Sequence, residues 1–472
     1  MLRTEILCLC FDCSCDLRVL RHDRIRNIRN HHTIKRKRGY RLPAVTTLPI
    51  FKFYSDDSSK NKVPREHPVS RTLRVLGQDF QYIGDKLFGG KKSEASERED
   101  TSANFEKFDF WQDHCDIAII GGGVIGSSIA YWIKQRVPKA VNVVVIEKDP
   151  TYSQASTTLS CGGLRQQFSL RQNIEMSQFG AQFLRECGKR LHVKGHDPPD
   201  VQFTPQGYLF LASAAGAQQL QENHELQMEM GVRNELLSNK QLKEKFPWLN
   251  TDDVELGCLG LENEGWFDPW SLLDGFKKKS ISLGTKYVQG EAVGFEFKSQ
   301  PDIPNGELKT VKFGLAVLAC GPSSGKVAEL ARIGVGSGLL SIPLPVEPSP
   351  PRSDLEPSNL DFEVDHAFFE EHVWPSLAHR IPAMQALKVQ SAWAGHYDYN
   401  YFDHNAILGP HPYHSNLYLA TGFSGHGLQQ APAIGRAVME LIIDGGFTTI
   451  DLSLFSFDRF LLGNKVLERN IV

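Results

Sequence analysis

The chain has 472 residues and a mass of 52.9 kDa, which at about 150 residues per domain suggests roughly three units or an intertwined pair. A hydrophobic fraction of 41% and a charged fraction of 23% are typical of a globular protein and exclude disorder throughout. No run approaches the ~18 consecutive apolar residues of a membrane span. The net charge of -3 gives no overall basic footprint, so we expect no nucleic-acid partner.

The basic residues gather at the N-terminus, where residues 1–45 carry eleven Lys/Arg against four Asp/Glu. An Arg-rich, acid-poor start is typical of a mitochondrial transit peptide. The run Lys35–Arg38 leaves a nuclear import patch or a solvated basic tail open as alternatives. Residues 46–112 are polar and mixed in charge, which predicts a linker.

Nine cysteines, an odd number, argue against a disulfide framework and for a reducing compartment. Four of them, Cys8, Cys10, Cys13 and Cys15, lie in the N-terminal segment without the second Cys or His pair of a zinc finger. We therefore expect no bound metal.

The first globular pattern is a strand, a tight turn and a helix. Apolar residues at 117–120 precede the glycine-rich turn 121–126, and isoleucines at helical spacing follow it. A second apolar strand at 143–146 ends in Glu147. This combination is the fingerprint of a dinucleotide-binding unit, in which an acidic residue lies about 20 residues beyond the turn. A flexible glycine turn is the weaker alternative.

Each residue of this fingerprint has a physical role. Gly121 permits the turn, Gly123 lets the backbone approach a pyrophosphate, and Gly126 allows close packing of helix on strand. The helix N-terminus offers unpaired N–H groups and a partial positive charge to the phosphates. Glu147 is expected to accept hydrogen bonds from ribose hydroxyls and to repel a 2′-phosphate, which disfavours NADP.

A second glycine-rich turn lies near the C-terminus. The strand-like run 417–421 leads into Gly422–Gly427, a helix follows with Pro432 expected in its first turn, and Gly445 closes it. An NAD domain needs no such element, whereas a flavin enzyme uses amides at a helix start to stabilise charge on the reduced isoalloxazine. An ordinary glycine turn capping a helix is the alternative.

These patterns predict an α/β protein with a discontinuous, Rossmann-like FAD-binding domain and an inserted α+β substrate domain, which a family resemblance implies is truncated. A third buried strand, at 315–319, ends at Gly321 beside the expected cofactor. The predicted boundaries are 1–45 for the basic leader, 46–112 for the linker, 113–190, 270–335 and 388–472 for the FAD-binding domain, and 191–269 and 336–387 for the insert. The insert is expected to cover the reactive face of the flavin.

Over about residues 113–472 the chain resembles the FAD-dependent amine and amino-acid oxidoreductases, a family that includes D-amino-acid oxidase, sarcosine oxidase and dimethylglycine dehydrogenase. The resemblance rests on the fingerprint and on the run Gly422–Pro432. It implies bound FAD and hydride abstraction from a carbon bearing an amine. Gly395 and Ser160 stand where some relatives carry the Cys or His that attaches the flavin, so non-covalent FAD is expected, with Cys161 a remote thioether candidate.

The same resemblance implies a set of cofactor contacts. The residues expected around the adenosine and diphosphate half are Gly121, Gly123, Val124, Ile125, Gly126, Glu147, Lys148, Ala155, Ser156, Thr157, Ala292 and Val293. The residues expected near the flavin are Gly321, Gly422, Phe423, Ser424, Gly425, His426 and Gly427. For His426, contact with the cofactor and a purely structural place at the helix start both remain open.

The candidate catalytic residues are His396, Tyr397 and Tyr399, which with Asp398 follow a run that resembles the family. A His side chain with a pKa near ~6.5 suits proton handling, and a Tyr hydroxyl suits substrate orientation. A polar loop turning above the domain is the alternative. Arg165 either meets a substrate carboxylate or pairs on the surface, and we favour the surface.

Two longer runs, Tyr152–Thr157 and Glu264–Trp270, resemble a mitochondrial branch of this family more narrowly. That resemblance implies a flavoprotein of the matrix, or the matrix side of the inner membrane, that supports assembly or stability of respiratory complex I. Complex I subunits or assembly intermediates are then its partners. The alternative is an oxidoreductase acting on a small amine or N-methyl amino acid. After Pro348 roughly fifty residues of the family's substrate sheet are missing, which leaves open strand edges.

Overall fold

The computed structural model describes residues 113–296, 310–335, 342–347 and 362–469, and the backbone of two short strands near the N-terminus. These strands, β1 (Leu9–Phe11) and β2 (Leu17–Val19), pair antiparallel. Apart from them, the predicted leader and linker lie outside the described residues, as does the Pro-rich stretch at 348–357.

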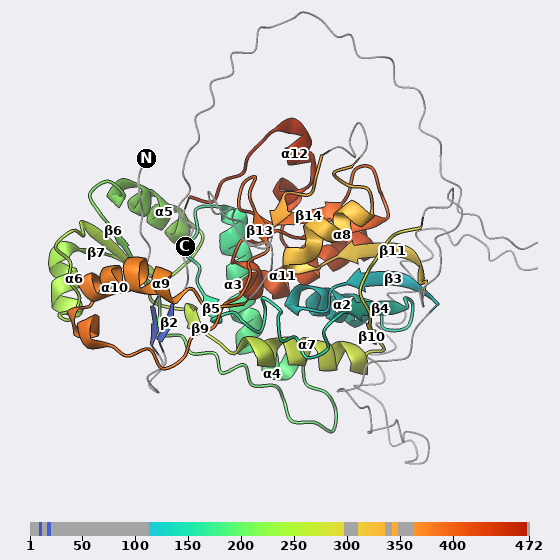
Figure 1. Ribbon diagram of the computed structural model, residues 1–472, viewed down its shortest axis with the longest axis horizontal. Coiled ribbons are helices and arrows are strands. Elements are labelled where there is room, and N and C mark those ends of the chain that lie inside the picture. The colour runs from blue at the N-terminus through green and yellow to red at the C-terminus, as the bar shows by residue number, and fades with distance from the viewer. Residues whose placement is uncertain are drawn as a thin grey trace, which may run out of the picture. The chain divides into compact units, whose positions relative to one another are not determined.

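A six-stranded sheet forms the centre of the described fold (Figure 1). In spatial order its strands are β10 (Lys286–Gln289), β4 (Val143–Glu147), β3 (His114–Ile120), β11 (Lys312–Leu318), β15 (Leu417–Thr421) and β14 (Ile407–Pro410). Neighbouring strands are parallel except β14, which runs antiparallel to β15. The predicted α/β architecture is confirmed, with the nucleotide turn at the end of the third strand in this order.

Alternate side chains of the sheet face two separate cores. Ile117 and Ile119 of β3 lie in one core with Val145 of β4, whereas Ala118 and Val144 lie in a cluster on the opposite face. Successive side chains of a strand point to opposite faces, so an uninterrupted apolar run covers both sides of a parallel sheet. This explains why residues 117–120 and 143–146 are apolar at every position rather than at every second one.

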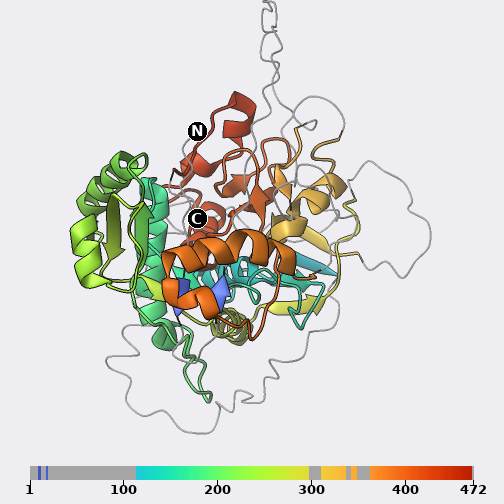
Figure 2. The same ribbon diagram turned by 60° about the vertical axis from the view of Figure 1, so that its left-hand side comes forward.

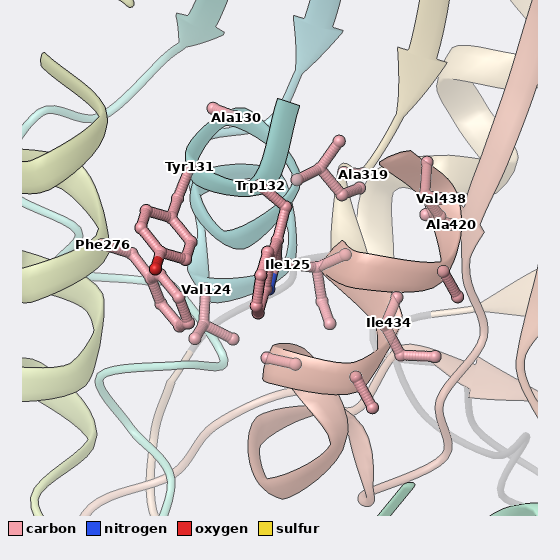
Figure 3. Close-up of a cluster of buried hydrophobic side chains, with 14 of the residues drawn as sticks. Val124, Ile125, Ala130, Tyr131, Trp132, Phe276, Ala319, Ala420, Ile434 and Val438 are labelled. Carbon is pink, nitrogen blue, oxygen red and sulfur yellow. The ribbon is translucent and has the colours of Figure 1, made fainter. Parts of the chain in front are cut away.

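The helices of the first core are α2 (Val124–Arg136), α3 (Arg171–Arg185), α7 (Pro269–Ser282) and α11 (Gly427–Met439). Figure 3 shows Tyr131 of α2 pointing toward Phe276 of α7, and their ring centroids are 5.5 Å apart. On its other side α2 packs against α11, where Trp132 Nε1 donates to the carbonyl oxygen of Pro432 at 2.9 Å. The helices that begin at the two glycine-rich turns are thus direct neighbours.

The opposite face of the sheet is covered near β11 by α8 (Ser324–Leu330), as Figure 1 shows. Ala328 and Ile333 pack there with Leu318 and Ile407 of the sheet. Phe457, from the C-terminal part of the chain, closes the same cluster. This second core joins the middle and the end of the sequence.

A separate three-stranded antiparallel sheet lies beside the main one (Figure 2). Its order is β6 (Leu209–Ala212), β8 (Leu256–Gly260) and β7 (Asn234–Ser238), with α5 (Ala217–Glu229) and α6 (Asn239–Lys245) packed nearby. Helix α10 (Trp374–Arg380) covers part of this sheet, because Leu377 and Ile381 pack against Leu209 and Leu211. Residues on both sides of the Pro-rich stretch therefore build this region.

The remaining elements are short. They are β5 (Gly163–Leu164), β9 (Gly265–Trp266), β12 (Val346–Glu347), β13 (Tyr399–Asn400), α4 (Cys187–Arg190), α9 (His366–Phe368) and α12 (Asp458–Leu462). The pairs β5 with β9 and β12 with β13 are antiparallel. Across the described ranges, every helix falls short of the length and hydrophobicity needed to span a bilayer.

The prediction that Pro432 lies in the first turn of its helix is wrong. Helix α11 begins at Gly427, directly after the glycine turn, so Pro432 lies inside it. Proline cannot donate to the carbonyl four residues earlier, which weakens the ladder at this point. The helix continues through a π turn and ends at Gly445, whose φ of +83° is the left-handed end that the sequence predicted.

Candidate cofactor-binding and active site

The first part of the site is the turn between β3 and α2. Gly121 has a φ of +99°, and a Cβ there would lie 2.2 Å from the carbonyl oxygen of Ala319. A Cβ on Gly126 would lie 2.0 Å from the carbonyl oxygen of Gly121. Neither position accepts a side chain, which brings the start of α2 directly against the end of β3.

Helix α2 begins without a side-chain cap. Gly123 is its N-cap residue and has no side chain to accept from the first-turn amides. The Val124 amide donates to Thr157 Oγ1 at 3.2 Å, which ties a second loop to the helix start. The first-turn amides beyond Val124 and the positive end of the helix dipole attract phosphate, so this turn fits a pyrophosphate.

Glu147, at the end of β4, turns its carboxylate back onto the glycine turn. Oε2 accepts from the Gly122 amide at 2.7 Å, and Oε1 accepts from the Asp149 amide at 2.9 Å. Burial raises the pKa of Glu147, and the two amides oppose that rise. The neighbouring Lys148 is exposed and lies 3.9 Å from Glu291. Glu147 therefore stands where a ribose acceptor is needed, whereas Lys148 faces solvent.

Asp149 orders the loop after β4. Its carboxylate accepts from the amides of Thr151 and Ser153 at 3.0 and 2.7 Å. Burial alone would raise the pKa of Asp149, but the hydroxyl and amide donors of these two residues lower it to about 2. The loop leads to a further turn, where Ser156 Oγ donates to the carbonyl oxygen of His396 at 2.5 Å. The nucleotide half of the site thus contacts the predicted catalytic segment.

The second glycine turn joins β15 to α11. Gly422, Ser424 and Gly425 have φ values of +74°, +48° and +91°, so the backbone is left-handed three times within four residues. The carboxylate of Asp398 accepts from the Phe423 amide at 3.1 Å, and its carbonyl accepts from the Ser424 amide at 3.2 Å. The segment before β13 therefore holds this turn in shape.

The three predicted catalytic residues lie on one segment but turn to different neighbours. The His396 ring packs edge-on against Phe362, with centroids 4.8 Å apart. Tyr397 lies against the second glycine turn, 3.4 Å from the position of a Cβ on its Gly425. The Tyr399 hydroxyl lies 2.9 Å from His404 Nε2. Tyr397 is therefore the one of the three whose ring contacts the turn expected at the flavin.

Asp398 lies in the same segment but is not among the three residues predicted to be catalytic. Burial raises the pKa of Asp398 to about 7, although the Phe423 amide and two others favour the charged form. A carboxyl group that titrates near neutral pH beside a cofactor turn suits proton transfer. Spacing in the sequence gives no sign of this, because the burial comes from residues far along the chain.

Arg165 is buried, so the favoured prediction of a surface ion pair is wrong. Its side chain is enclosed by the rings of Phe168 and Phe210, with the guanidinium carbon 4.2 and 5.4 Å from their centroids. Nη1 donates to the carbonyl oxygen of Gln167 at 2.9 Å, and Nη2 lies 3.3 Å from His426 Nε2. Arg165 directly follows strand β5, and its side chain is buried among these residues rather than directed to solvent.

His426 and Glu264 complete this buried polar cluster. The His426 ring packs edge-on against Phe168, and burial, followed by the Arg165 charge, lowers its pKa to about 3. Glu264 accepts from the Gln166 amide at 2.6 Å, and burial raises its pKa to about 7. His426 is thus neutral at physiological pH, and its ring is directed to Arg165 while its backbone stands in the turn.

The other predicted contacts lie at neighbouring strand ends. Thr421 Oγ1 donates to the carbonyl oxygen of Gly321 at 3.4 Å and to Ser324 Oγ at 2.7 Å, which joins the third turn to the second. Ala292 packs against the core on the α8 side of the sheet, whereas Val293 is 63% exposed. Within the described ranges there is no group of three or more His, Cys, Asp or Glu side chains arranged to hold a metal ion.

Comparison with known proteins identifies the family. The model of the family described as "DAO: FAD dependent oxidoreductase" matches residues 116–366 and 351–441. The chain belongs to this DAO family. The two matched segments meet at 351–366, where the sequence predicted a shortened substrate region.

Curated relatives of this chain include proteins named FAD-dependent oxidoreductase domain-containing protein 1. The Xenopus laevis protein is 44% identical over 465 positions, which cover 85% of this chain and 92% of the relative. The Drosophila melanogaster homolog is 42% identical over 481 positions, with 86% and 92% covered. In the Xenopus alignment 85% of 472, or about 401 residues of this chain, occupy the 465 positions, so about 64 positions have no residue from this chain.

The described fold is that of solved DAO enzymes. The crystal structure of L-proline dehydrogenase from P. horikoshii superposes with a TM-score of 0.61 at 25% identity, covering 75% of this chain and 100% of that one. Membership of the DAO family makes FAD the cofactor, and its non-covalent attachment stays a prediction. The residues present fit it: two glycine positions without room for a Cβ, an uncapped helix start and the Glu147 carboxylate form the cradle that the dinucleotide half requires.

Proposed function

We propose that this chain is a mitochondrial flavoprotein that supports the assembly or stability of respiratory complex I, with FAD as a resident cofactor. The observation that carries the proposal is an intact cofactor cradle combined with a shortened substrate region. A cradle without a full pocket wall fits a protein that needs FAD for its fold more than one that turns over a substrate. The basic, Arg-rich residues 1–45 support the mitochondrial part.

The physical basis of such a role is linkage between cofactor and fold. FAD binds the folded chain and not the unfolded one, so it stabilises the fold by mass action. The two glycine turns begin α2 and α11, which pack against each other. A cofactor held by both turns therefore strengthens the contact between the two ends of the domain, which presents one surface to partner subunits.

Complementation tests this proposal. In cells depleted of the endogenous protein, assembled complex I on native gels should fall, and re-expression of this chain should restore it. We expect a His396→Ala/Tyr399→Phe variant to restore complex I as well, because neither side chain is needed for the fold of the cradle. Glu147→Ala, which removes the ribose acceptor, should restore less in proportion to its lower flavin content.

Two results would count against an assembly role. Complex I that stays at its normal level after depletion removes the basis of the proposal. Restoration by the wild type but not by the His396→Ala/Tyr399→Phe variant, at equal flavin content, shifts the function to redox chemistry.

A second candidate function is oxidation of a C–N bond in a small amine or N-methyl amino acid. The favouring observation is Asp398, a half-buried carboxyl group with a pKa raised to about 7 by desolvation, on the segment that holds the flavin turn. When bound, FAD accepts a hydride from a carbon that bears an amine. The chain's own part is to orient and to handle protons: Ser156 donates to the His396 carbonyl, and the Asp398 carboxyl group, which accepts from the Phe423 amide, is the group that can carry a proton.

Anaerobic titration tests this second function. An active enzyme bleaches its flavin absorbance with a substrate amine in the absence of oxygen, and L-proline, sarcosine and dimethylglycine are suitable first probes. Asp398→Asn keeps the hydrogen bond geometry available but removes the titrating group, so the bleaching rate should lose its dependence on pH near neutrality. A flavin that stays oxidised with all three amines argues against this function.

A further inference from the structure

Tyr152 is a buried residue next to the cofactor cradle that the fingerprint does not include. It lies in the loop after β4 and is 2% exposed. Its hydroxyl oxygen is buried and has no hydrogen-bond partner among the described residues. A buried hydroxyl without a partner costs free energy, and native structures seldom retain one unless a ligand or water completes it.

The hydroxyl lies at the centre of the nucleotide turn. A Cβ built on Gly122 would be 3.3 Å from Tyr152 Oη and 3.3 Å from Glu147 Oε2. The phenol oxygen and the Glu147 carboxylate therefore both lie beside Gly122, between the first two glycines of the fingerprint. The Tyr152 ring is fixed from behind by Trp270, edge-on at 6.2 Å, and by Lys277, whose Nζ lies 5.3 Å from the ring centroid.

The backbone holds Tyr152 in an unfavourable conformation. Its φ is +54°, a region that bulky residues seldom occupy. Its amide donates to the carbonyl of Asp149 at 2.9 Å, and its carbonyl accepts from Thr158 Oγ1 at 2.6 Å. Strain of this kind persists only where the surroundings fix it, and it concentrates at ligand sites. The loop thus keeps a strained backbone conformation at Tyr152, which places this hydroxyl beside the turn.

Tyr287 shows what a purely structural tyrosine looks like in the same neighbourhood. It is 1% exposed, and its hydroxyl donates to Ser127 Oγ at 3.0 Å and lies 3.3 Å from Ser280 Oγ. Its hydrogen bonding is complete within the protein. The two tyrosines share burial and side-chain type, but only Tyr287 has protein partners for its hydroxyl among the described residues.

From these observations we infer that Tyr152 is a cofactor-binding residue whose hydroxyl donates a hydrogen bond to the adenosine diphosphate half of FAD. The inference rests on the FAD site alone and stands whether or not the chain turns over a substrate. It adds a side-chain donor to a cradle in which the fingerprint supplies backbone amides and one carboxylate.

Binding to the full chain after reversible removal of FAD tests this inference, with Tyr152→Phe as the variant and Tyr287→Phe as its matched control. Tyr152→Phe should weaken both FAD and ADP by about tenfold, because ADP shares the adenosine diphosphate half. The melting temperature of the flavin-free protein should stay the same or rise, since the variant removes a hydroxyl that lacks a partner there. Tyr287→Phe should instead lower that melting temperature, and change ADP affinity less than twofold.

Three results would overturn the inference. One is unchanged affinity of Tyr152→Phe for both ligands. Another is a loss of FAD affinity without any loss for ADP, which places the contact at the flavin half. The third is a fall in the melting temperature of flavin-free Tyr152→Phe equal to that of Tyr287→Phe, which marks the hydroxyl as structural.

Discussion

At the scale of single residues, the site is built from ionisable groups held away from water. Arg165 lies between two aromatic rings, and His426 and Glu264 are its polar neighbours. Buried charges of this kind are expensive unless they are paired, so their protonation states are set by the fold rather than by the solvent. A neutral His426 lets the guanidinium of Arg165 remain charged beside it.

The pH dependence of stability follows from His426. Its pKa is lowered to about 3, by burial first and by Arg165 second, from 6.5. Between those values the unfolded state binds more protons, so stability falls as pH falls, by about 2 kcal/mol at pH 5. We predict that the free energy of unfolding falls between pH 7 and pH 5 by about 2 kcal/mol less in His426→Asn than in the wild type. Urea denaturation of the FAD-loaded protein at the two pH values measures this.

The exposed His192→Asn is the control for this prediction, and it should follow the wild type at both pH values. Glu264 and Asp398 act in the opposite sense, since burial raises the pKa of each to about 7 and their contribution falls as pH rises toward that value. The comparison of variant with wild type cancels these terms. Equal pH dependence of His426→Asn and wild type would show that the imidazole is not buried neutral.

At the scale of elements, the end of the chain acts as a strap across the start of α3. The carboxylate of Glu468 accepts from the amides of Ser169 and Leu170 at 2.6 and 3.2 Å, and from Asn173 Nδ2 at 2.9 Å. An anion at a helix N-terminus is favourable, and Glu468 is 3% exposed, so water screens it little. Asn173 in turn accepts from Gln430 of α11 at 3.2 Å.

We predict that Glu468→Gln lowers the stability of the protein by about 2 kcal/mol, because an amide group replaces one of two acceptor oxygens and faces a donor. Thermal unfolding monitored by circular dichroism measures this. Glu291→Gln is the matched control: its pair with Lys148 is 3.9 Å long and mostly exposed, so its loss should cost less than about 0.5 kcal/mol. A Glu468→Gln protein as stable as the control would mean that the strap does not hold α3.

What the sequence predicts at this scale depends on how local the cause is. The turn at 121–126, the acid that ends β4 and the left-handed Gly445 are each set by neighbouring residues, and the structure has them where the pattern indicates. The burial of Arg165 and the hold of Asp398 on the Phe423 amide arise from contacts between distant segments. Such contacts produce no periodicity or residue spacing in the sequence from which they could be predicted.

At the scale of the whole molecule, the cofactor site is drawn from both ends of the described domain. The first glycine turn precedes α2, the second precedes α11, and Ser128 Oγ of the first helix donates to the Ala431 carbonyl of the second at 2.7 Å. A ligand that contacts both turns therefore stabilises the domain as a unit. The free energy of binding therefore adds to the free energy of unfolding of the whole domain, and not only to the local stability of one loop.

The purified protein should accordingly be yellow, and should release free flavin on acid precipitation, because Gly395 and Ser160 stand where some relatives carry the Cys or His that attaches the flavin. FAD at 100 times its dissociation constant should add about 2.7 kcal/mol to the stability of the flavin-free chain. A shift in melting temperature with FAD concentration measures this. An unchanged melting temperature, or flavin that stays with the precipitate, would contradict the expectation.

The order of the strands along the chain also determines how long β11 lacks its partner β15 during synthesis. Strand β11 ends at Leu318, but its partner β15 begins at Leu417, about a hundred residues later. A ribosome that adds about 5–20 residues per second leaves the outer edge of β11 unpaired for roughly 5–20 seconds. During that interval a parallel, apolar strand is open to pairing with other chains. The nascent protein is therefore exposed to aggregation through this strand edge until β15 has been synthesised.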